Sequence, residues 1–305
     1  MEQAATSWQG KRVAITGATG LIGSELARRL RERGAEALSI TRSPKSETDI
    51  GWDLTEGTLD ATRLEALDAV VHLAGESVAG RWSDARKARI RASRLEGTTL
   101  LCSTLASLKR KPAALVSASA VGFYGSQGDR VLTEDAPAGE GFLAEVCQVW
   151  EDAAQPAREA GIRVCHPRIG IVLSPEGGAL EKMLTPFKMG VGGRLGDGRQ
   201  YMSWIHLADV VASILFALEA ELSGPFNCTA PNPVTNAAFT KSLGGALKRP
   251  TAIPLPRFAA KLALGGQQAD EMLFTSQRVV PAALEARGFT FRFPTIDGAF
   301  ADFFG

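Results

Sequence analysis

The chain has 305 residues, 45% of them hydrophobic, so it is long enough to bury a sizeable core as one large α/β unit with an appendage. Its formal net charge of +1 gives no electrostatic footprint for nucleic acid, and no apolar run approaches the length of a membrane span. We therefore expect a protein that binds neither nucleic acid nor a membrane.

Thiol and imidazole side chains are scattered along the chain. The cysteines form no Cys-x-x-Cys pair, which is typical of a reducing compartment: Cys102, Cys147, Cys165 and Cys228. The histidines, His72, His166 and His206, have no metal-ligand spacing. The opening stretch MEQAATSWQG lacks the basic and apolar segments of a secretory signal. We expect a cytoplasmic protein without a metal site.

The first predicted strand, Val13–Thr16, leads through a glycine-rich turn into a helix that ends at Gly34. Three glycines stand three residues apart, at Gly17, Gly20 and Gly23. The first permits a tight turn, the second lets the backbone approach a pyrophosphate, and the third lets the helix pack closely on the strand. N–H groups at the helix start then face the phosphates. Between a strand and a helix, this spacing predicts a dinucleotide site.

The next predicted strand, in EALSITRSP, indicates which dinucleotide is bound. An NAD site usually has an acidic residue at the end of this strand, but this chain has Thr41, Arg42 and Ser43. A guanidinium beside hydroxyl groups suits a 2′-phosphate, which favours NADP(H). The alternative is that Arg42 is an ordinary solvated loop arginine.

Two further strands end in residues that suit the same cofactor. The stretch IGWDL places Asp53 where its carboxylate can accept a hydrogen bond from an adenine amino group. The stretch DAVVHLAGES ends a buried strand in Leu73, Ala74 and Gly75, small enough for the backbone to pass beneath the cofactor.

Strands and helices alternate from residue 10 to about residue 170, which predicts an α/β fold with a doubly wound parallel sheet of the NAD(P)-binding Rossmann type. We assign residues 10–174 to the dinucleotide-binding domain, with a contribution from about 200–230. Residues 175–199 and 231–305 are assigned to a smaller, mostly C-terminal substrate-binding part, which closes one side of a cleft.

At this point the sequence resembles the short-chain dehydrogenase/reductase superfamily, in its extended and atypical branch of NAD-dependent epimerases and dehydratases. The stretches that carry the resemblance span nearly the whole chain: TGATGLIG, DAVVHLAGES, RLEGTTLL, VSASAVGFYG, CHPRIGIVL, MSWIHLADVV, PFNCTAPNPVTNAAF and QRVVPAALEARGF. The resemblance implies NAD(P) binding and action on nucleotide sugars or other small hydroxyl or carbonyl compounds. With it, the predicted cofactor contacts are Gly17, Thr19, Gly20, Leu21, Ile22, Gly23, Thr41, Arg42, Ser43, Asp53, Leu73, Ala74, Gly75, Ser117, Pro167 and Arg168.

The catalytic pair of this superfamily is missing. Its members use a tyrosine and, four residues on, a lysine that lowers the phenol pKa so that the group exchanges a proton near neutral pH. This chain has two tyrosines, Tyr124 and Tyr201, and the residues four positions later are Gly128 and Ile205. The Tyr-x-x-x-Lys motif is therefore absent from the whole sequence.

A register can still be proposed by similarity to extended members. Taking Glu151 as the glutamate that follows the family lysine places Leu143 at the tyrosine position and Cys147 at the lysine position. Ser119 matches the catalytic serine, and Arg94 stands where the extended pattern has asparagine. We expect Leu143, Cys147 and Glu151 to share one helical face.

Tyr124 is the first candidate to replace the missing acid, because it follows Ser119 by five residues at the end of a strand where ligands bind in this fold. The alternative is a partly buried loop tyrosine. Arg94 is expected to hold an anionic substrate or orient a carbonyl, or else to form an internal salt bridge. Cys147 is a nucleophile only if its pKa falls, and packing is the favoured interpretation.

Five other polar residues are candidate contributors to the site. Glu145 is expected to point away from the cleft, and Glu76 to be a solvated carboxylate. His206 is expected to pack at the start of the helix containing Asp209. Arg194 and Arg199 lie in the glycine-rich stretch GGRLGDGRQYMSW and either cover an anionic substrate or belong to a solvated hairpin.

Two function hypotheses follow. The first is an NADP(H)-dependent reductase or epimerase-like isomerase acting on a small hydroxyl or carbonyl compound through a non-standard site containing Ser119 and Tyr124. The second is a catalytically silent NADPH-binding regulatory or sensor protein. The partner is a small-molecule substrate in the first case, and the protein is a monomer or a homodimer joined through the helices near 84–108 and 143–155.

Overall fold

The computed structural model describes residues 8–305. The prediction that the opening stretch is not a secretory signal concerns residues 1–10, and most of these lie outside the described residues. A central sheet with strand order β13-β9-β6-β5-β1-β2-β3-β4 organises the molecule. Neighbours in it are parallel except β3 and β4, and β7 pairs with β9. Its strands are β1 (Arg12–Thr16), β2 (Glu36–Thr41), β3 (Ile50–Asp53), β4 (Thr58–Leu59), β5 (Ala69–His72), β6 (Ala114–Ser117), β7 (Ser119–Ala120), β9 (Arg163–Ile169) and β13 (Gly224–Cys228).

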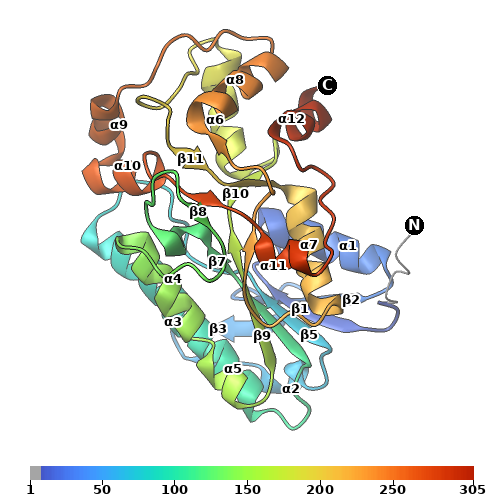
Figure 1. The fold of residues 1–305 in the computed structure, drawn as a ribbon. Coiled ribbons are helices and arrows are strands. Elements are labelled where there is room, and N and C mark those ends of the chain that lie inside the picture. The colour runs from blue at the N-terminus through green and yellow to red at the C-terminus, as the bar shows by residue number, and fades with distance from the viewer. Residues whose placement is uncertain (1–7) are drawn as a thin grey trace.

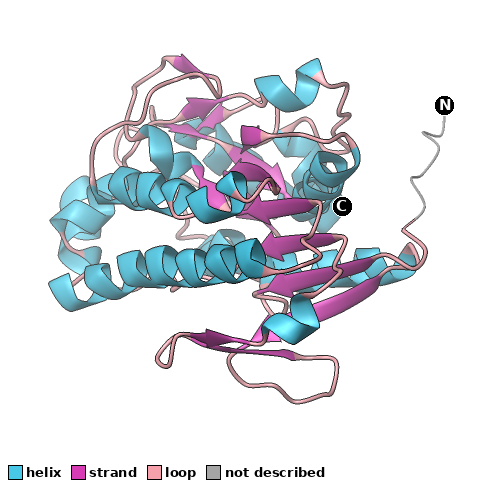
Figure 2. Ribbon diagram, turned by 90° about the horizontal axis from the view of Figure 1, so that it is seen from below, coloured by secondary structure: helices cyan, strands magenta, loops and turns pink. Residues whose placement is uncertain are grey.

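Helices cover both faces of this sheet (Figures 1 and 2). In β1, the side chains of Val13 and Ile15 enter one hydrophobic core, whereas Ala14 enters the core on the opposite face. The first core contains residues of α1 (Leu21–Glu32), α7 (Leu207–Glu219) and α11 (Ala282–Ala286). The second contains residues of α2 (Ala61–Leu64), α3 (Asp84–Ser107) and α5 (Gln155–Glu159). The expected doubly wound α/β fold is confirmed.

Parallel strands buried on both faces read as continuous apolar runs, which is why the central strands were recognisable. All the residues of β5 and β6 are buried. The expected helix boundaries also agree with the structure near the cofactor loop. α1 ends at Glu32, and Gly34 follows with φ of +87°, the left-handed conformation that ends helices.

Most of the later segments gather above the carboxyl ends of the strands, at the top of Figure 1. They enclose a third hydrophobic core that includes Leu184, Trp204, Phe239 and Phe300. Their elements are α6 (Gly178–Lys188), β10 (Ile171–Leu173), β11 (Tyr201–Met202), β12 (Trp204–His206), β14 (Val234–Thr235), α8 (Asn236–Ala246), α9 (Arg257–Leu264), α10 (Gly266–Met272) and α12 (Ile296–Phe304). The exact division at residues 174, 199 and 231 stays a prediction.

The remaining elements join the two parts. β8 (Val131–Leu132) pairs with β15 (Arg278–Val279), so the chain after β7 is tied to the C-terminal region. The 3-10 helix η1 (Val121–Tyr124) and α4 (Phe142–Asp152) lie between the sheet and that region. Within residues 8–305, none of the helices combines the length and the apolar character needed to cross a membrane.

Candidate functional site

The glycine loop between β1 and α1 has the geometry that a dinucleotide site requires. Gly17 has φ of +70°, and a Cβ there would stand 3.1 Å from the backbone nitrogen of Ala74. A Cβ at Gly23 would lie 2.2 Å from the carbonyl oxygen of Gly17, so only glycine lets the helix pack this closely. α1 has neither a side-chain cap nor an acidic residue in its first turn, leaving the N–H groups of Leu21 and Ile22 to an anion.

The neighbouring strands present the other expected contacts at the same edge. Arg42 is exposed directly after β2, and the hydroxyl of Thr41 accepts a hydrogen bond from the Ser43 N–H at 3.2 Å. Asp53 ends β3 and is exposed, and its Oδ1 accepts hydrogen bonds from the N–H groups of Thr55 and Glu56. The Asp53 carboxylate therefore shapes the following turn.

Thr16, at the end of β1, holds the loop that follows β5. Its Oγ1 accepts hydrogen bonds from the N–H groups of Leu73 and Ala74, each at 3.0 Å, and lies 2.7 Å from His72 Nδ1. The loop is thereby fixed against Gly17. Sequence reasoning missed Thr16, although a hydroxyl in the last strand position before the glycine turn was a usable signal.

A cavity of about 500 Å³ lies at the carboxyl end of the sheet, beside this loop. Its walls come from η1, α4, the junction of β9 with β10, α6, β11 and α10, and from the short segments next to them. Among the residues named from the sequence, Arg94, Leu143, Cys147 and Tyr201 line it. Arg94, Leu143 and Cys147 converge on one cavity, as the proposed register expects, and the register itself stays a prediction.

Arg94 projects from α3 into the wall of the cavity. Its Nη1 donates hydrogen bonds to the carbonyl oxygens of Glu76 and Ile90, at 3.0 and 3.1 Å. Its guanidinium lies over the ring of Trp150, 4.7 Å from the ring centroid. Burial lowers the pKa of Arg94 below its usual value. Within residues 8–305, no carboxylate forms an ion pair with it, so the expected alternative of an internal salt bridge is wrong.

Cys147 is a poor nucleophile in this environment. Burial, followed by the negative charge of Glu151, raises the pKa of its thiol to about 11, although Arg94 acts in the opposite direction. The thiol is therefore protonated near neutral pH, which agrees with the interpretation of Cys147 as a packing residue. Leu143 carries no ionisable group, so neither position supplies the missing proton transfer.

Tyr124 does not reach the cavity, and its expected catalytic role is wrong. The side chain is fully buried, and its hydroxyl donates to Asn227 Oδ1 at 2.7 Å while accepting from Arg168 Nη1 at 2.9 Å. Burial raises the pKa of Tyr124, and the Arg168 charge offsets this only in part. The phenol is a structural group between the sheet and the C-terminal region.

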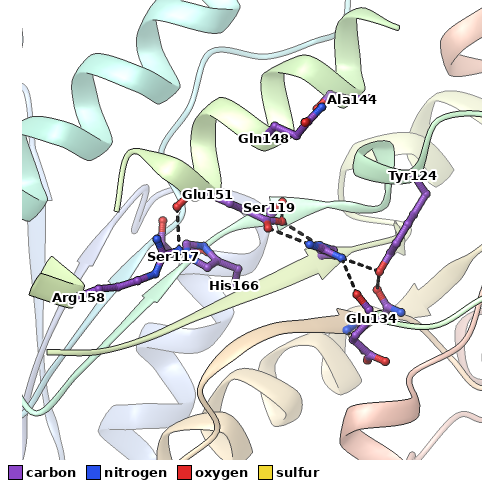
Figure 3. A network of polar contacts seen from close by, with 11 residues as sticks. Ser117, Ser119, Tyr124, Glu134, Ala144, Gln148, Glu151, Arg158 and His166 are labelled. Carbon is purple, nitrogen blue, oxygen red and sulfur yellow. Dashed lines mark hydrogen bonds and ion pairs between the residues drawn. The ribbon is translucent and has the colours of Figure 1, made fainter. Parts of the chain in front are cut away.

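Ser119 lies just behind the cavity wall rather than in it. It is 2% exposed, and its hydroxyl donates to Glu151 Oε1 at 2.7 Å, while the next residue, Ala120, lines the cavity. Figure 3 shows Ser119 and Glu151 on one side of this polar network and Tyr124 with Glu134 on the other. The expectation that Ser119 touches substrate is therefore corrected, because its hydroxyl is held by a buried carboxylate.

Arg168 is also corrected, since its guanidinium serves the same network and not a cofactor. Nε and Nη2 contact the two carboxylate oxygens of Glu151, both at 2.9 Å, and the group lies 3.5 Å from the ring centroid of Phe123. Pro167 is buried inside β9. The residues at the end of that strand, Ile169–Ile171, line the cavity instead.

Ser117 is a further correction among the predicted cofactor contacts. It is fully buried, and within the described part of the chain its hydroxyl has no hydrogen-bond partner. Its carbonyl oxygen accepts a hydrogen bond from His166 Nδ1 at 3.0 Å, as Figure 3 shows. A residue enclosed in this way cannot present its side chain to a ligand.

The other polar candidates lie outside the cavity. Glu145 is exposed on α4, as expected, and Glu76 lies 3.9 Å from Arg86. Arg194 and Arg199 are both exposed, and neither lines the cavity, which agrees with a solvated loop. Within residues 8–305, no three histidine, cysteine, aspartate or glutamate side chains are placed to hold a metal ion.

His206 begins α7, as expected from the sequence. Its Nδ1 accepts a hydrogen bond from the Ala208 N–H at 3.0 Å, and its ring is stacked between Phe293 and Phe303. Asp209 accepts hydrogen bonds from the backbone of Arg292 and Phe293. This cluster fastens the C-terminal segment and has no access to the cavity.

Glu271 is a site residue that the sequence did not indicate. It lines the cavity, and its carboxylate accepts hydrogen bonds from the N–H groups of Phe142 and Leu143, at 3.2 and 2.9 Å. A Cβ at Gly141 would stand 3.2 Å from that carboxyl group, so glycine makes room for it. α10 therefore caps the helix that carries Leu143 and Cys147.

Comparison with protein-family models identifies the family. Residues 13–228 match the model described as "NAD dependent epimerase/dehydratase family". The chain belongs to this family. Residues 255–303, which include α9, α10 and most of α12, match a second model, "Domain of unknown function (DUF1731)".

Two proteins illustrate how far the similarity extends. The Epimerase family protein Mb2239 of Mycobacterium bovis is 47% identical over 290 residues, covering 94% of this chain and 95% of that protein. The crystal structure of human epimerase family protein SDR39U1 (isoform 2) with NADPH has a TM-score of 0.88 and 34% identity, covering 95% of this chain and 98% of that one.

A second solved structure has a more specific name. It is the nucleoside-diphosphate sugar epimerase from Corynebacterium glutamicum, with a TM-score of 0.81 and 37% identity. The similarity covers 98% of this chain and 59% of that one. All three comparisons extend over both the sheet and the segments above it.

Proposed function

We propose that this protein is an NADP(H)-dependent oxidoreductase or epimerase-like isomerase, which acts on a small hydroxyl or carbonyl compound in the cavity beside the glycine loop. The observation that supports this proposal most is that the glycine loop and the cavity are continuous. Gly75, in the loop fixed by Thr16, lies against Arg94, because a Cβ there would stand 3.3 Å from Arg94 Cζ. Arg94 in turn lines the cavity.

The residues present fit NADP(H). The glycine loop leaves room for a pyrophosphate at the start of α1, and the exposed Arg42 suits a 2′-phosphate. The similarity to human SDR39U1, which was solved with NADPH, supports the same cofactor. When bound, NADP(H) supplies hydride-transfer chemistry at its nicotinamide ring.

The chain's own contribution is to bind and orient the substrate oxygen. Arg94 can donate hydrogen bonds to an oxygen atom of the substrate and so fix the position of the substrate in the cavity. The Cys147 thiol stays protonated, and Leu143 is inert, so proton exchange falls to another group in the cavity or to water. Because losing one general acid typically forfeits about 10²–10⁴ in rate, turnover should be slow unless the chemistry is easy.

The test is a turnover assay. Purified protein is mixed with NADPH and a panel of carbonyl compounds, and the absorbance of the reduced nicotinamide is followed. We expect the protein to consume NADPH. We expect Arg94→Met to reduce this consumption without changing the affinity for NADPH. Consumption that Arg94→Met leaves intact would reject this site, because the cavity would then not hold the reacting group.

A regulatory function is the second candidate, and a specific observation favours it. In the register proposed from Glu151, Leu143 and Cys147 stand where the resembled superfamily keeps its proton-transfer pair, and neither can exchange a proton near neutral pH. Micromolar NADPH binding without turnover on a broad panel would favour this candidate. A cofactor-dependent change in protection of α10, measured by hydrogen exchange, would then identify the responding element.

A further inference from the structure

The cavity walls are predominantly apolar. Hydroxyl and amide groups are a minority among the lining residues. Most lining residues carry aliphatic, thioether or indole groups, among them Val78, Val121, Leu143, Val146, Trp150 and Met183. Further apolar side chains on β11 and α10 continue this surface towards the C-terminal part. A sugar ring needs several polar partners to replace its water, whereas apolar walls reward a ligand whose body is hydrocarbon.

Charge is distributed unevenly in this cavity. Arg94 is the cation among its lining residues, whereas Glu140, Asp270 and Glu271 are carboxylates. Two of the three carboxylates have partners. Asp270 pairs with Arg257 and Lys261 at 2.9 and 2.7 Å, and Glu271 accepts from the start of α4. A nucleoside diphosphate would bring two phosphate groups into a cavity whose lining offers one cation, so at least one negative charge would lack a cationic partner there.

Arg94 is a partly buried cation that forms no ion pair with a carboxylate of residues 8–305. The hydrogen bonds that it makes within residues 8–305 use Nη1, and the two acceptors are neutral carbonyl oxygens. Its guanidinium rests on the indole face of Trp150, which leaves the edge with Nε and Nη2 as the remaining donors. A buried charge without a counter-ion is costly, and an anionic ligand group removes that cost.

We propose that the cavity binds an apolar monocarboxylate, with its carboxylate on the remaining donors of Arg94 and its hydrocarbon body against the apolar walls. The proposal rests on the proposed function in that it names the substrate class of the same site. A guanidinium edge matches a planar carboxylate in geometry as well as charge. A volume of about 500 Å³ falls within the range of small-molecule sites.

The test uses calorimetric titration of the NADPH-saturated full chain with octanoate, octan-1-ol and UDP-glucose. Octanoate is expected to bind at least about tenfold more tightly than octan-1-ol, because a charge-assisted bidentate contact replaces a neutral one. UDP-glucose is expected to bind more weakly than octanoate. Tighter binding of UDP-glucose than of octanoate would overturn the proposal.

Variants then assign the preference to Arg94. Arg94→Met keeps an apolar stem of similar length and is expected to weaken octanoate about tenfold or more, with octan-1-ol changed less than about threefold. Arg94→Lys keeps the charge without the planar edge and should give an intermediate octanoate affinity. Arg91→Met, an exposed arginine on the same helix, is the matched control and should change neither. Thermal melts confirm that each variant is folded.

Other outcomes of these titrations also decide whether the ligand proposal holds. Equal octanoate affinity in the parent and in both Arg94 variants would overturn the proposal. So would a tenfold loss of NADPH affinity in Arg94→Met together with competition between octanoate and NADPH, because the cation would then serve a cofactor phosphate. If the chain binds no NADPH, the same titration on the protein alone tests the ligand class separately from the proposed cofactor. Arg94-dependent octanoate binding would support the ligand class while rejecting the proposed cofactor.

Discussion

Arg42 stands in solvent at the end of β2, beside the hydroxyl groups of Thr41 and Ser43. If it binds a 2′-phosphate, replacing it by serine removes charge-assisted hydrogen bonds worth roughly 1.5–3 kcal/mol. Arg42→Ser should therefore weaken NADPH by about 10- to 150-fold and leave NADH within about threefold, as measured by fluorescence titration. Arg89→Ser, an exposed arginine on α3, is the control. An equal loss for both cofactors would contradict the assignment.

Tyr124 allows a second prediction, because the chain's other tyrosine is a natural control. Tyr124→Phe removes the hydroxyl between Asn227 and Arg168 and leaves buried polar atoms with one partner fewer. The free energy of unfolding should fall by about 1–3 kcal/mol in urea denaturation, with turnover and NADPH affinity unchanged.

Tyr201 lines the cavity, and within residues 8–305 its hydroxyl makes no hydrogen bond. Tyr201→Phe should change stability by less than about 0.5 kcal/mol. A large loss of turnover in Tyr124→Phe, without a loss of stability, would restore the catalytic interpretation that the structure rejects.

Individual residues differ in how far sequence could assign them. Gly17 and Gly23 were readable because their spacing between a strand and a helix encodes local geometry. Leu143 and Cys147 were placed on one helical face because helical periodicity is also local, whereas Arg94 was assigned by resemblance to the extended family. Tyr124 was misjudged because its partner Asn227 lies 103 residues away, and nothing near Tyr124 announces that contact.

At the scale of elements, α4 depends on a distant helix for its start. Gly141 precedes it with φ of +107° and offers no side-chain cap, and Glu271 of α10 supplies the missing acceptor. Glu271→Ala should therefore lower stability by about 0.5–2 kcal/mol, the usual effect of losing a cap. It should also speed hydrogen exchange at the N–H groups of Phe142 and Leu143, which lose their acceptor.

Glu271→Gln is the matched variant, because it keeps an accepting oxygen but loses the charge that favours a helix N-terminus. Its exchange rates should lie between those of the parent and of Glu271→Ala. Unchanged protection at Phe142 and Leu143 in Glu271→Ala would show that the contact does not hold the helix. Such a result would also separate α10 from the positioning of the cavity wall.

The elements themselves were largely predictable, but their docking was not. Buried apolar runs and the alternation of strands with helices indicated the parallel sheet and its layers. The contact between α10 and α4 brings together segments about 130 residues apart, and an acceptor far along the chain leaves no periodic trace. Glu271 lines the cavity, and the sequence anticipated only a few of the lining residues, among them Arg94, Leu143 and Cys147.

At the scale of the whole molecule, all the histidines lie buried and neutral, and this predicts the pH dependence of folding. Burial lowers the pKa of His72 from 6.5 to about 4, with the charges of Arg94 and His166 acting in the same direction. Its ring lies between the hydroxyls of Thr16 and Thr98. Burial likewise lowers the pKa of His166 to about 4, where Arg158 and Arg168 oppose protonation and Glu151 favours it.

The hydrogen bonds of His166 explain why its ring stays neutral. Its Nδ1 donates to the Ser117 carbonyl, and its Nε2 accepts from the Arg158 guanidinium at 2.6 Å, so a second proton would face a cation. The pKa of His206 is also lowered, by burial, although Asp302 and Asp209 act against this. Asp209 has the opposite linkage, because burial raises its pKa from 3.8 and acid then favours its folded state.

Between pH 6.5 and 4 the unfolded chain therefore binds protons that the folded histidines do not. The free energy of unfolding should fall as the pH is lowered through this window, by up to about 1.4 kcal/mol per pH unit for each histidine. Urea denaturation at several pH values between 7 and 4.5 measures how the free energy of unfolding changes with pH. His72→Asn should reduce this slope by about the contribution of one bound proton. Because Asp209 acts in the opposite direction, the deciding comparison is the variant: a slope that is the same in His72→Asn and in the parent would contradict a neutral, buried His72.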